Sequence, residues 1–225
     1  MNTETQQHTS SSAKMLKAMV GIGTMCALLI VLTYEGTLSR VKQLKAEALE
    51  QAIFKVLPGV TTIQPFQLKA DGQFAKIEKA EAGMQVVFAG YDDAGKWKGL
   101  AIAASGQGYA DIIRILYGYD PQEEAIIGFY VLESKETPGL GDKIEKDESF
   151  LANFKRLTAK LKSDLSGLEN PIIPVKSGTK EQDWEVDGIT GATISSRAIA
   201  NMLDASGNEI LHLVQKQKAV FEKKN

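Results

Sequence analysis

A hydroxyl-rich turn stands immediately before an amphipathic stretch near the C-terminal end of the chain. The turn reads Thr190-Gly191-Ala192-Thr193. The predicted helix that follows has apolar residues at three- and four-residue steps, namely Ile194, Ala198, Ile199, Met202 and Leu203. Free backbone N–H groups and the positive end of the helix dipole converge at such a junction, which predicts an anion site. Gly191 and Ala192 leave room for a phosphate beside the Thr193 hydroxyl, whereas the simpler interpretation is a threonine that caps the helix.

Two glycine-containing segments elsewhere would allow a ligand to approach the backbone closely. The first, Glu136-Thr137-Pro138-Gly139-Leu140-Gly141, comes directly after an apolar stretch. Its Pro138-Gly139 pair fits the two central positions of a type II turn, and Gly141 permits another close approach. The second segment is Gly106-Gln107-Gly108-Tyr109, whose glycines would admit a ring or a neighbouring backbone, or mark a bulge or a bend.

Short apolar stretches predict the strands that position these segments. Turn-rich breaks at 92–95 and 120–123 separate the stretches in pairs, so antiparallel hairpins are expected. The predicted strands are 84–91, 97–104, 111–119 and 124–134, with a short strand around 184–186. Helices are predicted near 148–161 and from about 194 to 218, with a Pro/Gly-rich connection at 170–179 between them. Strands precede helices without βαβ alternation, so the predicted fold class is α+β, with antiparallel strands and flanking helices.

An apolar stretch near the N-terminus predicts a membrane anchor. Residues 15–34 carry one charge, Lys17, near one end, and a helix of this length spans the roughly 30 Å of a hydrocarbon core. No small-x-small cleavage pattern follows at 34–39, which favours a retained transmembrane helix over a cleaved signal peptide or a buried core helix. Apolar spacing then continues to Pro58-Gly59. The predicted organisation is a tail at 1–14, a transmembrane helix at 15–34, a stalk helix at 35–60 and a domain at 61–225.

Composition narrows the chemistry of that domain. The formal net charge is −2 and no basic cluster with interleaved aromatic residues occurs, so nucleic-acid binding is not expected. The single cysteine, Cys26, lies in the apolar stretch, which excludes an intramolecular disulfide and a cysteine-based iron–sulfur site. His8 and His212 show no metal-ligand spacing. Any redox chemistry is therefore expected from a bound organic cofactor.

The order of these segments resembles a known family. An N-terminal span, a GxGY segment, residues 136–141 and then Asp187-Gly188-x-Thr190-Gly191-Ala192-Thr193-x-Ser195 are similar to the FMN-binding family of respiratory ion pumps. That family includes the G subunit of the Rnf electron-transport complex and the C subunit of the sodium-translocating NADH:quinone reductase. In the family, a flavin transferase esterifies the FMN phosphate to the last threonine of an S/T-G-A-T motif. The matching residue here is Thr193, and Thr190 stands at the first position of the motif.

The resemblance implies an FMN site with Thr193 as the covalent attachment point. The other residues of this site would be Thr190, Gly191, Ala192, Ser195, Glu136, Thr137, Pro138, Gly139, Leu140 and Gly141. The 136–141 loop would lie against the flavin, with Thr137 and backbone groups offering hydrogen bonds. Glu136 would either tune the flavin or be a solvated surface acid. Asp187 would either serve recognition by the flavin transferase or cap a turn.

The resemblance also implies a location and partners. The chain would be a single-pass protein of the cytoplasmic (inner) membrane, with residues 1–14 in the cytoplasm and the FMN domain on the periplasmic or extracellular side. It would carry electrons as a non-autonomous part of a larger enzyme, among the other membrane and peripheral subunits of an Rnf-type complex that couples ferredoxin and NAD to ion translocation.

Three alternatives stay open at this point. The C subunit of the quinone reductase would be identified by its partner subunits. A membrane-tethered FMN-binding redox sensor would be isolated stably without redox partners. A cofactor-free binding domain would be colourless.

Overall fold

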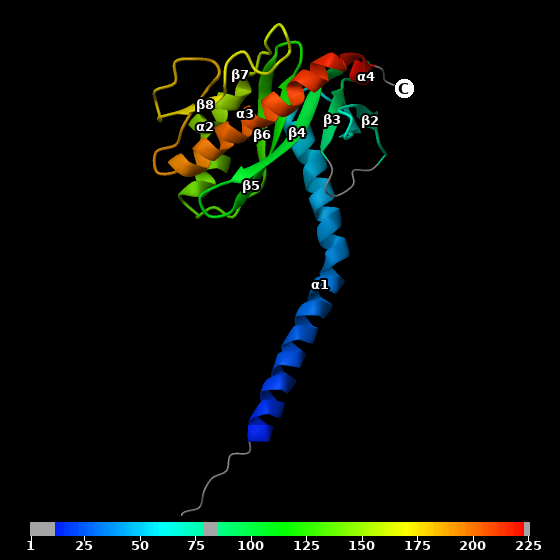
Figure 1. Cartoon of the computed structure of the whole chain (residues 1–225), viewed down its shortest axis with the longest axis vertical. Coiled ribbons are helices and arrows are strands. Elements are labelled where there is room, and N and C mark those ends of the chain that lie inside the picture. Colours follow the sequence, from blue (N-terminus) through cyan, green and yellow to red (C-terminus); the bar gives the residue numbers. More distant parts are fainter. Residues whose placement is uncertain (1–11, 79–84, 223–225) are drawn as a thin grey trace, which may run out of the picture. The chain divides into compact units, whose positions relative to one another are not determined.

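The computed structural model describes residues 12–78 and 85–222 of the chain (Figure 1). Residues 1–11 of the predicted tail, Met84 of the predicted strand 84–91 and the last three residues lie outside this described part. One helix, α1 (Ser12–Val56), covers the predicted transmembrane helix and most of the predicted stalk, and it ends four residues before the expected position 60. Internal contacts divide the chain into two units, one up to Glu47 and one from Ala48 onward.

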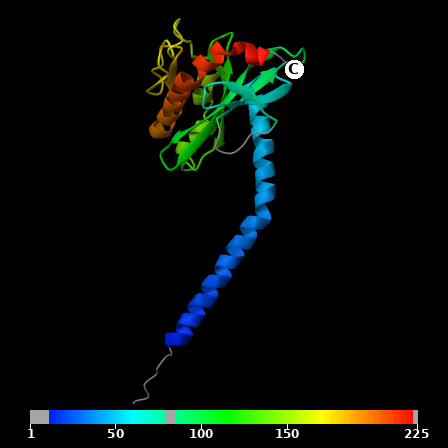
Figure 2. The same cartoon turned by 45° about the vertical axis from the view of Figure 1, so that its right-hand side comes forward.

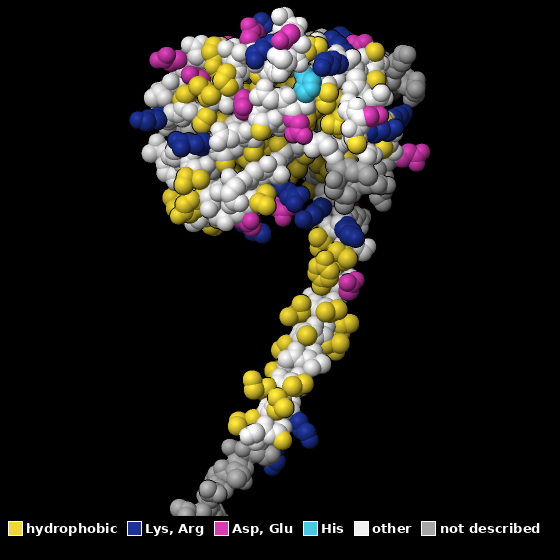
Figure 3. Space-filling view, in the orientation of Figure 1, with side chains coloured by type: hydrophobic (Ala, Val, Ile, Leu, Met, Phe, Trp, Pro, Cys, Tyr) yellow, Lys and Arg dark blue, Asp and Glu magenta, His cyan; other side chains and the backbone are white. Residues whose placement is uncertain are grey.

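The first unit is the part of α1 that precedes Ala48. An 18-residue window of this helix has a mean hydropathy of 2.2 and none of it is buried. Hydrophobic side chains stand out along the helix (Figure 3). The hydroxyl of Thr33 donates to the carbonyl of Leu29 at 2.7 Å, so this polar group is satisfied within the helix. The helix is long and apolar enough to cross a membrane.

The second unit is built on a seven-stranded antiparallel sheet with the order β2-β1-β3-β4-β5-β6-β7. The strands are β1 (Thr62–Leu68), β2 (Phe74–Lys76), β3 (Val86–Tyr91), β4 (Trp97–Gln107), β5 (Ile112–Asp120), β6 (Ala125–Glu133) and β7 (Leu157–Thr158). The predicted β3–β4 and β5–β6 hairpins are confirmed by their antiparallel registers. The strands β1, β2 and β7 were not predicted.

The rest of the unit is helical or irregular. The remaining elements are η1 (Gly141–Glu145), α2 (Glu148–Ala152), η2 (Asn153–Lys155), α3 (Thr193–Lys216), α4 (Lys218–Glu222) and the parallel pair β8 (Ile173–Val175) and β9 (Glu185–Asp187). The predicted helix at 148–161 is wrong beyond Ala152. The Asn153 amide donates to the carbonyls of Phe150 and Asp187, and Leu157 pairs with Ile126 at the edge of the sheet. The predicted connection at 170–179 contains strand β8.

Helix α3 covers one face of the sheet (Figures 1 and 2). Its buried side chains, such as Ile199 and Leu203, belong to the same hydrophobic cluster as Ile102 of β4 and Ile115 of β5. The hydroxyls of Tyr117 and Ser206 lie 2.8 Å apart, which satisfies two polar groups inside this core. The predicted helix at 194–218 is therefore confirmed, and its first turn is fixed against the sheet.

The opposite face of the sheet is covered by the end of α1. Its buried residues Ala52, Ile53 and Val56 form a second core cluster with Ala101 and Leu116. The strands are apolar on both faces, so a single covering helix would leave one face in water. For this reason the compact unit that internal contacts define begins at Ala48 and includes the end of α1.

Candidate functional site

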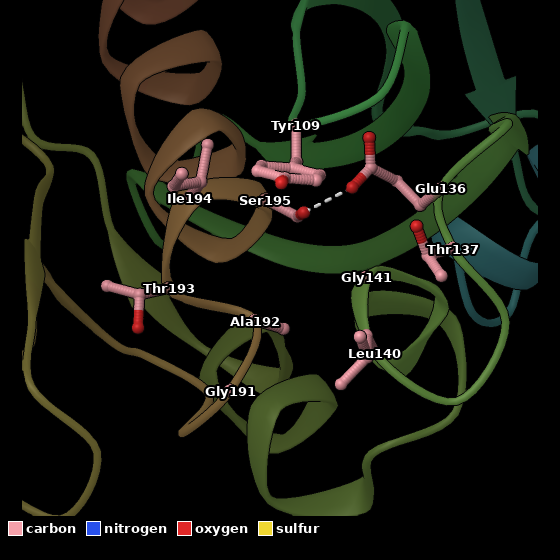
Figure 4. Close-up of a pocket in the computed structure, with 10 residues that line it drawn as sticks. All are labelled: Tyr109, Glu136, Thr137, Leu140, Gly141, Gly191, Ala192, Thr193, Ile194 and Ser195. Atoms are coloured by element: carbon pink, nitrogen blue, oxygen red, sulfur yellow. Dashed lines mark hydrogen bonds between the residues drawn. The ribbon is translucent and has the colours of Figure 1, made fainter.

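A cavity of about 360 Å³ opens at the start of α3. Three segments far apart in the sequence enclose it: the first turn of α3, the 136–141 loop and the turn between β4 and β5 (Figure 4). Its lining residues are Tyr109, Glu136, Thr137, Leu140, Gly141, Gly191, Ala192, Thr193, Ile194 and Ser195. The structure thus brings together the segments that the sequence singled out.

The first turn of α3 presents Thr193 to solvent. Ala192 precedes the helix, and its N–H donates to the carbonyl of Ile189 at 3.0 Å, which closes a turn with Gly191 at φ +86°. Thr193 is the first helical residue, and the cap position is held by Ala192, which makes no side-chain capping bond. The interpretation of Thr193 as the helix cap is therefore wrong. Thr193 is exposed and is one of the residues that line the cavity.

The electrostatic setting of Thr193 follows from the helix that begins there. The first amides of an α-helix have no acceptor within the helix, and the aligned peptide dipoles place partial positive charge at this end. Helix α3 is 24 residues long, so many aligned peptide dipoles contribute to the partial positive charge at its N-terminal end. The geometry supports the predicted anion site beside Thr193.

The 136–141 loop contains the predicted turn. The N–H of Leu140 donates to the carbonyl of Thr137 at 3.1 Å, and Gly139 has φ +79°, as the third residue of a type II turn requires. Asp142 holds this turn because its carboxylate accepts from the N–H of Gly139 at 2.6 Å. The hydrogen bond from Lys146 is the main reason why the pKa of the Asp142 carboxyl is lowered. The type II turn is therefore confirmed.

Glu136 is buried, with 6% of its surface exposed. One carboxylate oxygen accepts from the N–H of Ala110 at 2.9 Å, and the other accepts from the Ser195 hydroxyl at 2.5 Å. The interpretation of Glu136 as a solvated surface acid is therefore wrong. The glycines Gly108 and Gly141 make room for this side chain and do not face an open binding surface.

Three exposed side chains with apolar surface surround the cavity. Tyr109 is 68% exposed, Ile194 is 54% exposed and Leu140 is 52% exposed. Figure 4 shows the Tyr109 ring close to Ile194 and to the Ser195–Glu136 hydrogen bond. Tyr109 and Ile194 were absent from the predicted site residues. Their place in the sequence could have identified them as site residues, because Tyr109 ends the GxGY segment and Ile194 follows Thr193 directly.

Comparison with known proteins decides the family. Residues 108–206 match the FMN-binding domain family, which covers both the 136–141 loop and the start of α3. The chain is 30% identical over 195 residues to the G subunit of the ion-translocating oxidoreductase complex of Methanosarcina acetivorans, covering 86% of this chain and 91% of that protein. The chain belongs to the G-subunit family of ion-translocating oxidoreductase complexes.

Bacterial members of the G-subunit family match a shorter region. The G subunit from Pasteurella multocida is 37% identical over 105 residues, and that from Haemophilus influenzae strain PittEE is 34% identical over 103 residues. These alignments cover 46% and 44% of this chain, and under half of each relative. Membership of the family, with one helix in the described part long and apolar enough to span a bilayer, makes the chain a single-pass membrane protein.

Two solved structures share the fold of this G-subunit family member. Shewanella oneidensis NqrC superposes with a TM-score of 0.61 at 19% identity, over 79% of this chain and 99% of that chain. The C subunit of the Na(+)-translocating NADH-quinone reductase from Parabacteroides distasonis gives a TM-score of 0.57 at 21% identity, over 83% and 98%. The predicted resemblance and the α+β fold class are confirmed.

The remaining predicted residues lie beside the cavity without lining it. Thr190 is the second residue of the turn that ends at Ala192, and Pro138 and Gly139 are the central residues of the turn before Leu140. These residues shape the loops of the site in this G-subunit family member, but their side chains do not enclose it.

Asp187 has a structural contact. Its carboxylate accepts from the N–H of Gly178 at 2.8 Å and of Thr179 at 3.3 Å. Of the two predicted roles, the structure shows the capping of a turn.

Proposed function

We propose that this protein is a membrane-anchored electron-transfer subunit that carries FMN covalently, through a phosphoester on Thr193. One observation carries the proposal. Within the region that matches the FMN-binding domain family, the exposed Thr193 is the first residue of α3 and one of the residues that line the cavity. A phosphate on this oxygen would stand beside the free amides of the first helical turn, which favour an anion.

The residues of the cavity fit FMN. A volume of about 360 Å³ is within the range of small-molecule sites, which runs from roughly 300 to 1,000 Å³. Tyr109, Leu140 and Ile194 offer exposed apolar surface for a flat ring system, and Thr137 offers a hydroxyl at the wall. An apolar lining with a few polar groups is what a planar, partly polar cofactor needs.

The chain's own residues bind and orient, and the cofactor supplies the redox chemistry. Bound FMN takes up and releases electrons through its ring. Thr193 would be an anchor that keeps the flavin on the protein in both oxidation states, and the type II turn between Thr137 and Leu140 would hold one wall of the site in place. The neighbouring Ala192 has no side chain beyond Cβ, so the phosphate has access to the Thr193 oxygen.

We also propose that this protein works as a subunit of a larger complex. Its relatives are named as G subunits of ion-translocating oxidoreductase complexes, so we place the chain in an Rnf-type complex with other membrane and peripheral subunits. A flavin transferase would attach the FMN, and the FMN domain would face the periplasm or the cell exterior. The alternative, the C subunit of a quinone reductase, is supported by fold likeness at 19% identity, whereas the G-subunit relationship reaches 30% over 86% of the chain.

The attachment is tested by in-gel fluorescence of the denatured protein. The full chain is produced in a host that contains the flavin transferase, and the wild type is expected to give a fluorescent band under ultraviolet light. Thr193→Val should abolish this signal because it removes the hydroxyl. Thr62→Val is the matched control, since it makes the same substitution at an exposed threonine of β1, outside both the motif and the cavity, and should stay fluorescent. A fluorescent Thr193→Val band, or a dark wild type in the presence of transferase and FMN, overturns the attachment.

A further inference from the structure

Glu136 is the only acidic or basic side chain that is buried among the described residues. It is also the only charged residue among those that line the cavity. The described ion pairs do not include it, and its hydrogen-bond donors are an amide and a hydroxyl. Burying an acidic side chain is unfavourable unless hydrogen bonds compensate, so its position beside the cavity calls for a reason.

The carboxylate of Glu136 connects all three segments of the site. It belongs to the 136–141 loop, and it accepts from the amide of Ala110, which follows Tyr109 in the β4–β5 turn. Its other oxygen accepts from the hydroxyl of Ser195 in the first turn of α3, 59 residues further along the chain. One side chain thus joins the segment of Tyr109 to the segment of Thr193.

Two glycines are required by the space that this side chain occupies. A Cβ atom on Gly108 would lie 2.5 Å from a carboxylate oxygen of Glu136 and 2.6 Å from the side chain of Ile113. A Cβ atom on Gly141 would lie 2.8 Å from the Cβ of Glu136. Neither glycine has a positive φ, so the close contact explains them and the backbone conformation does not. The surrounding backbone is therefore shaped around the carboxylate.

We propose that Glu136 is a positioning residue that holds the cavity walls together and places a fixed negative charge beside the bound flavin, which lowers the flavin reduction potential. This inference rests on the proposed function. A negative charge in a poorly solvated wall interacts strongly with charge added nearby, so it opposes the uptake of electrons by the ring.

The charge is tested by Glu136→Gln. Glutamine keeps both hydrogen bonds, because its carbonyl can accept from Ala110 and its NH₂ group can donate to the Ser195 oxygen. Covalent FMN content and thermal stability are therefore expected to stay at wild-type values. The equilibrium constant for two-electron reduction should rise at least tenfold, an increase of about 30 mV in midpoint potential. Glu145→Gln is the matched control, because it removes the same charge from an exposed residue outside the cavity, and its potential should not change.

The positioning role is tested without the flavin, by hydrogen–deuterium exchange on the full chain carrying Thr193→Val. Replacing Glu136 by alanine removes the acceptor of the Ala110 amide. Exchange across residues 107–113 should then accelerate at least tenfold. Glu136→Gln in the same background should keep the protection, since its carbonyl still accepts.

The outcomes separate this inference from the proposed function. If the FMN-loaded Glu136→Gln protein has the wild-type potential, the charge of Glu136 does not lower the flavin potential. If amide exchange is unchanged in the Glu136→Ala protein, Glu136 does not hold the cavity walls in place. A wild type without covalent flavin overturns the proposed function and the charge together, whereas the exchange measurement still decides the positioning role.

Discussion

The main-chain carbonyl oxygen of Val56 occupies the space that a Cβ atom on Gly118 of β5 would need. The same end of α1 packs against Gly128, which is the cross-strand partner of Gly118. A Cβ atom on Gly128 would lie 2.5 Å from the Cα of Val56. The end of α1 thus rests on a patch of bare backbone, which fixes it to the domain.

Gly118→Ala should therefore destabilise the domain. The added methyl group would overlap the Val56 carbonyl, and overpacking of this kind costs about 1–3 kcal/mol. Thermal unfolding of the full chain in detergent measures the loss. Gly36→Ala is the control, since it adds a methyl group with nothing within 4 Å and should not lower the midpoint. Equal midpoints for Gly118→Ala and wild type would contradict the close contact.

Gly139→Val should keep covalent FMN but change its midpoint potential. Nothing lies within 4 Å of a Cβ atom at this position, so the cost is the backbone strain at φ +79°, about 1–2 kcal/mol. The turn should shift, and with it the walls formed by Thr137 and Leu140. Gly59→Val imposes the same strain at φ +79° outside the cavity and should leave the potential unchanged. Flavin content, potential and turnover of the assembled complex are measured together, and a normal potential and turnover would show that the turn does not affect the flavin.

Asp147→Ala should destabilise the domain in a pH-dependent way. The Asp147 carboxylate caps α2 by accepting from the amides of Ser149 and Phe150, both at 3.0 Å, and loss of such a cap costs about 1 kcal/mol. Hydrogen bonds from the Ser149 hydroxyl and then from the Phe150 amide lower the pKa of Asp147. A lowered pKa contributes stability that is present above the unfolded-state pKa of about 3.9 and is lost as the pH falls through the folded-state value.

Urea unfolding of both proteins, from pH 7 downward, measures this difference. The gap between wild type and Asp147→Ala should be largest at neutral pH and should shrink in acid. Asp147→Asn keeps an oxygen that accepts the amides and should lose less stability than the alanine variant. A gap that stays constant with pH would show that the charge of Asp147 does not contribute.

The domain after Tyr34 should be accessible to protease added to intact spheroplasts. The expectation rests on the apolar helix and on the outward orientation that we propose for the FMN domain. A cytoplasmic marker protein should stay intact in the same sample. Protection of the domain until the membrane is permeabilised would reverse the orientation.

Local sequence patterns were sufficient to predict several strands, one long helix and one turn of this protein. Alternating and continuous apolar runs predicted β3 to β6 and α3, because burial on a sheet face or a helix stripe leaves a periodic pattern. The turn at Pro138-Gly139 was predictable because φ +79° at Gly139 is a requirement of that turn type. Thr193, the proposed attachment residue, was singled out by the TGAT segment before a helix and by the family resemblance.

Only the tertiary structure decided how these segments meet. Helix α2 stops at Ala152 because Asn153 bonds to Asp187, 34 residues away, and the strands β1 and β2 depend on partners and not on a strong pattern of their own. The burial of Glu136 has the same origin. Its partners Ala110 and Ser195 lie 26 and 59 residues away, and no local pattern records a hydrogen bond that exists only after the sheet and α3 have packed together.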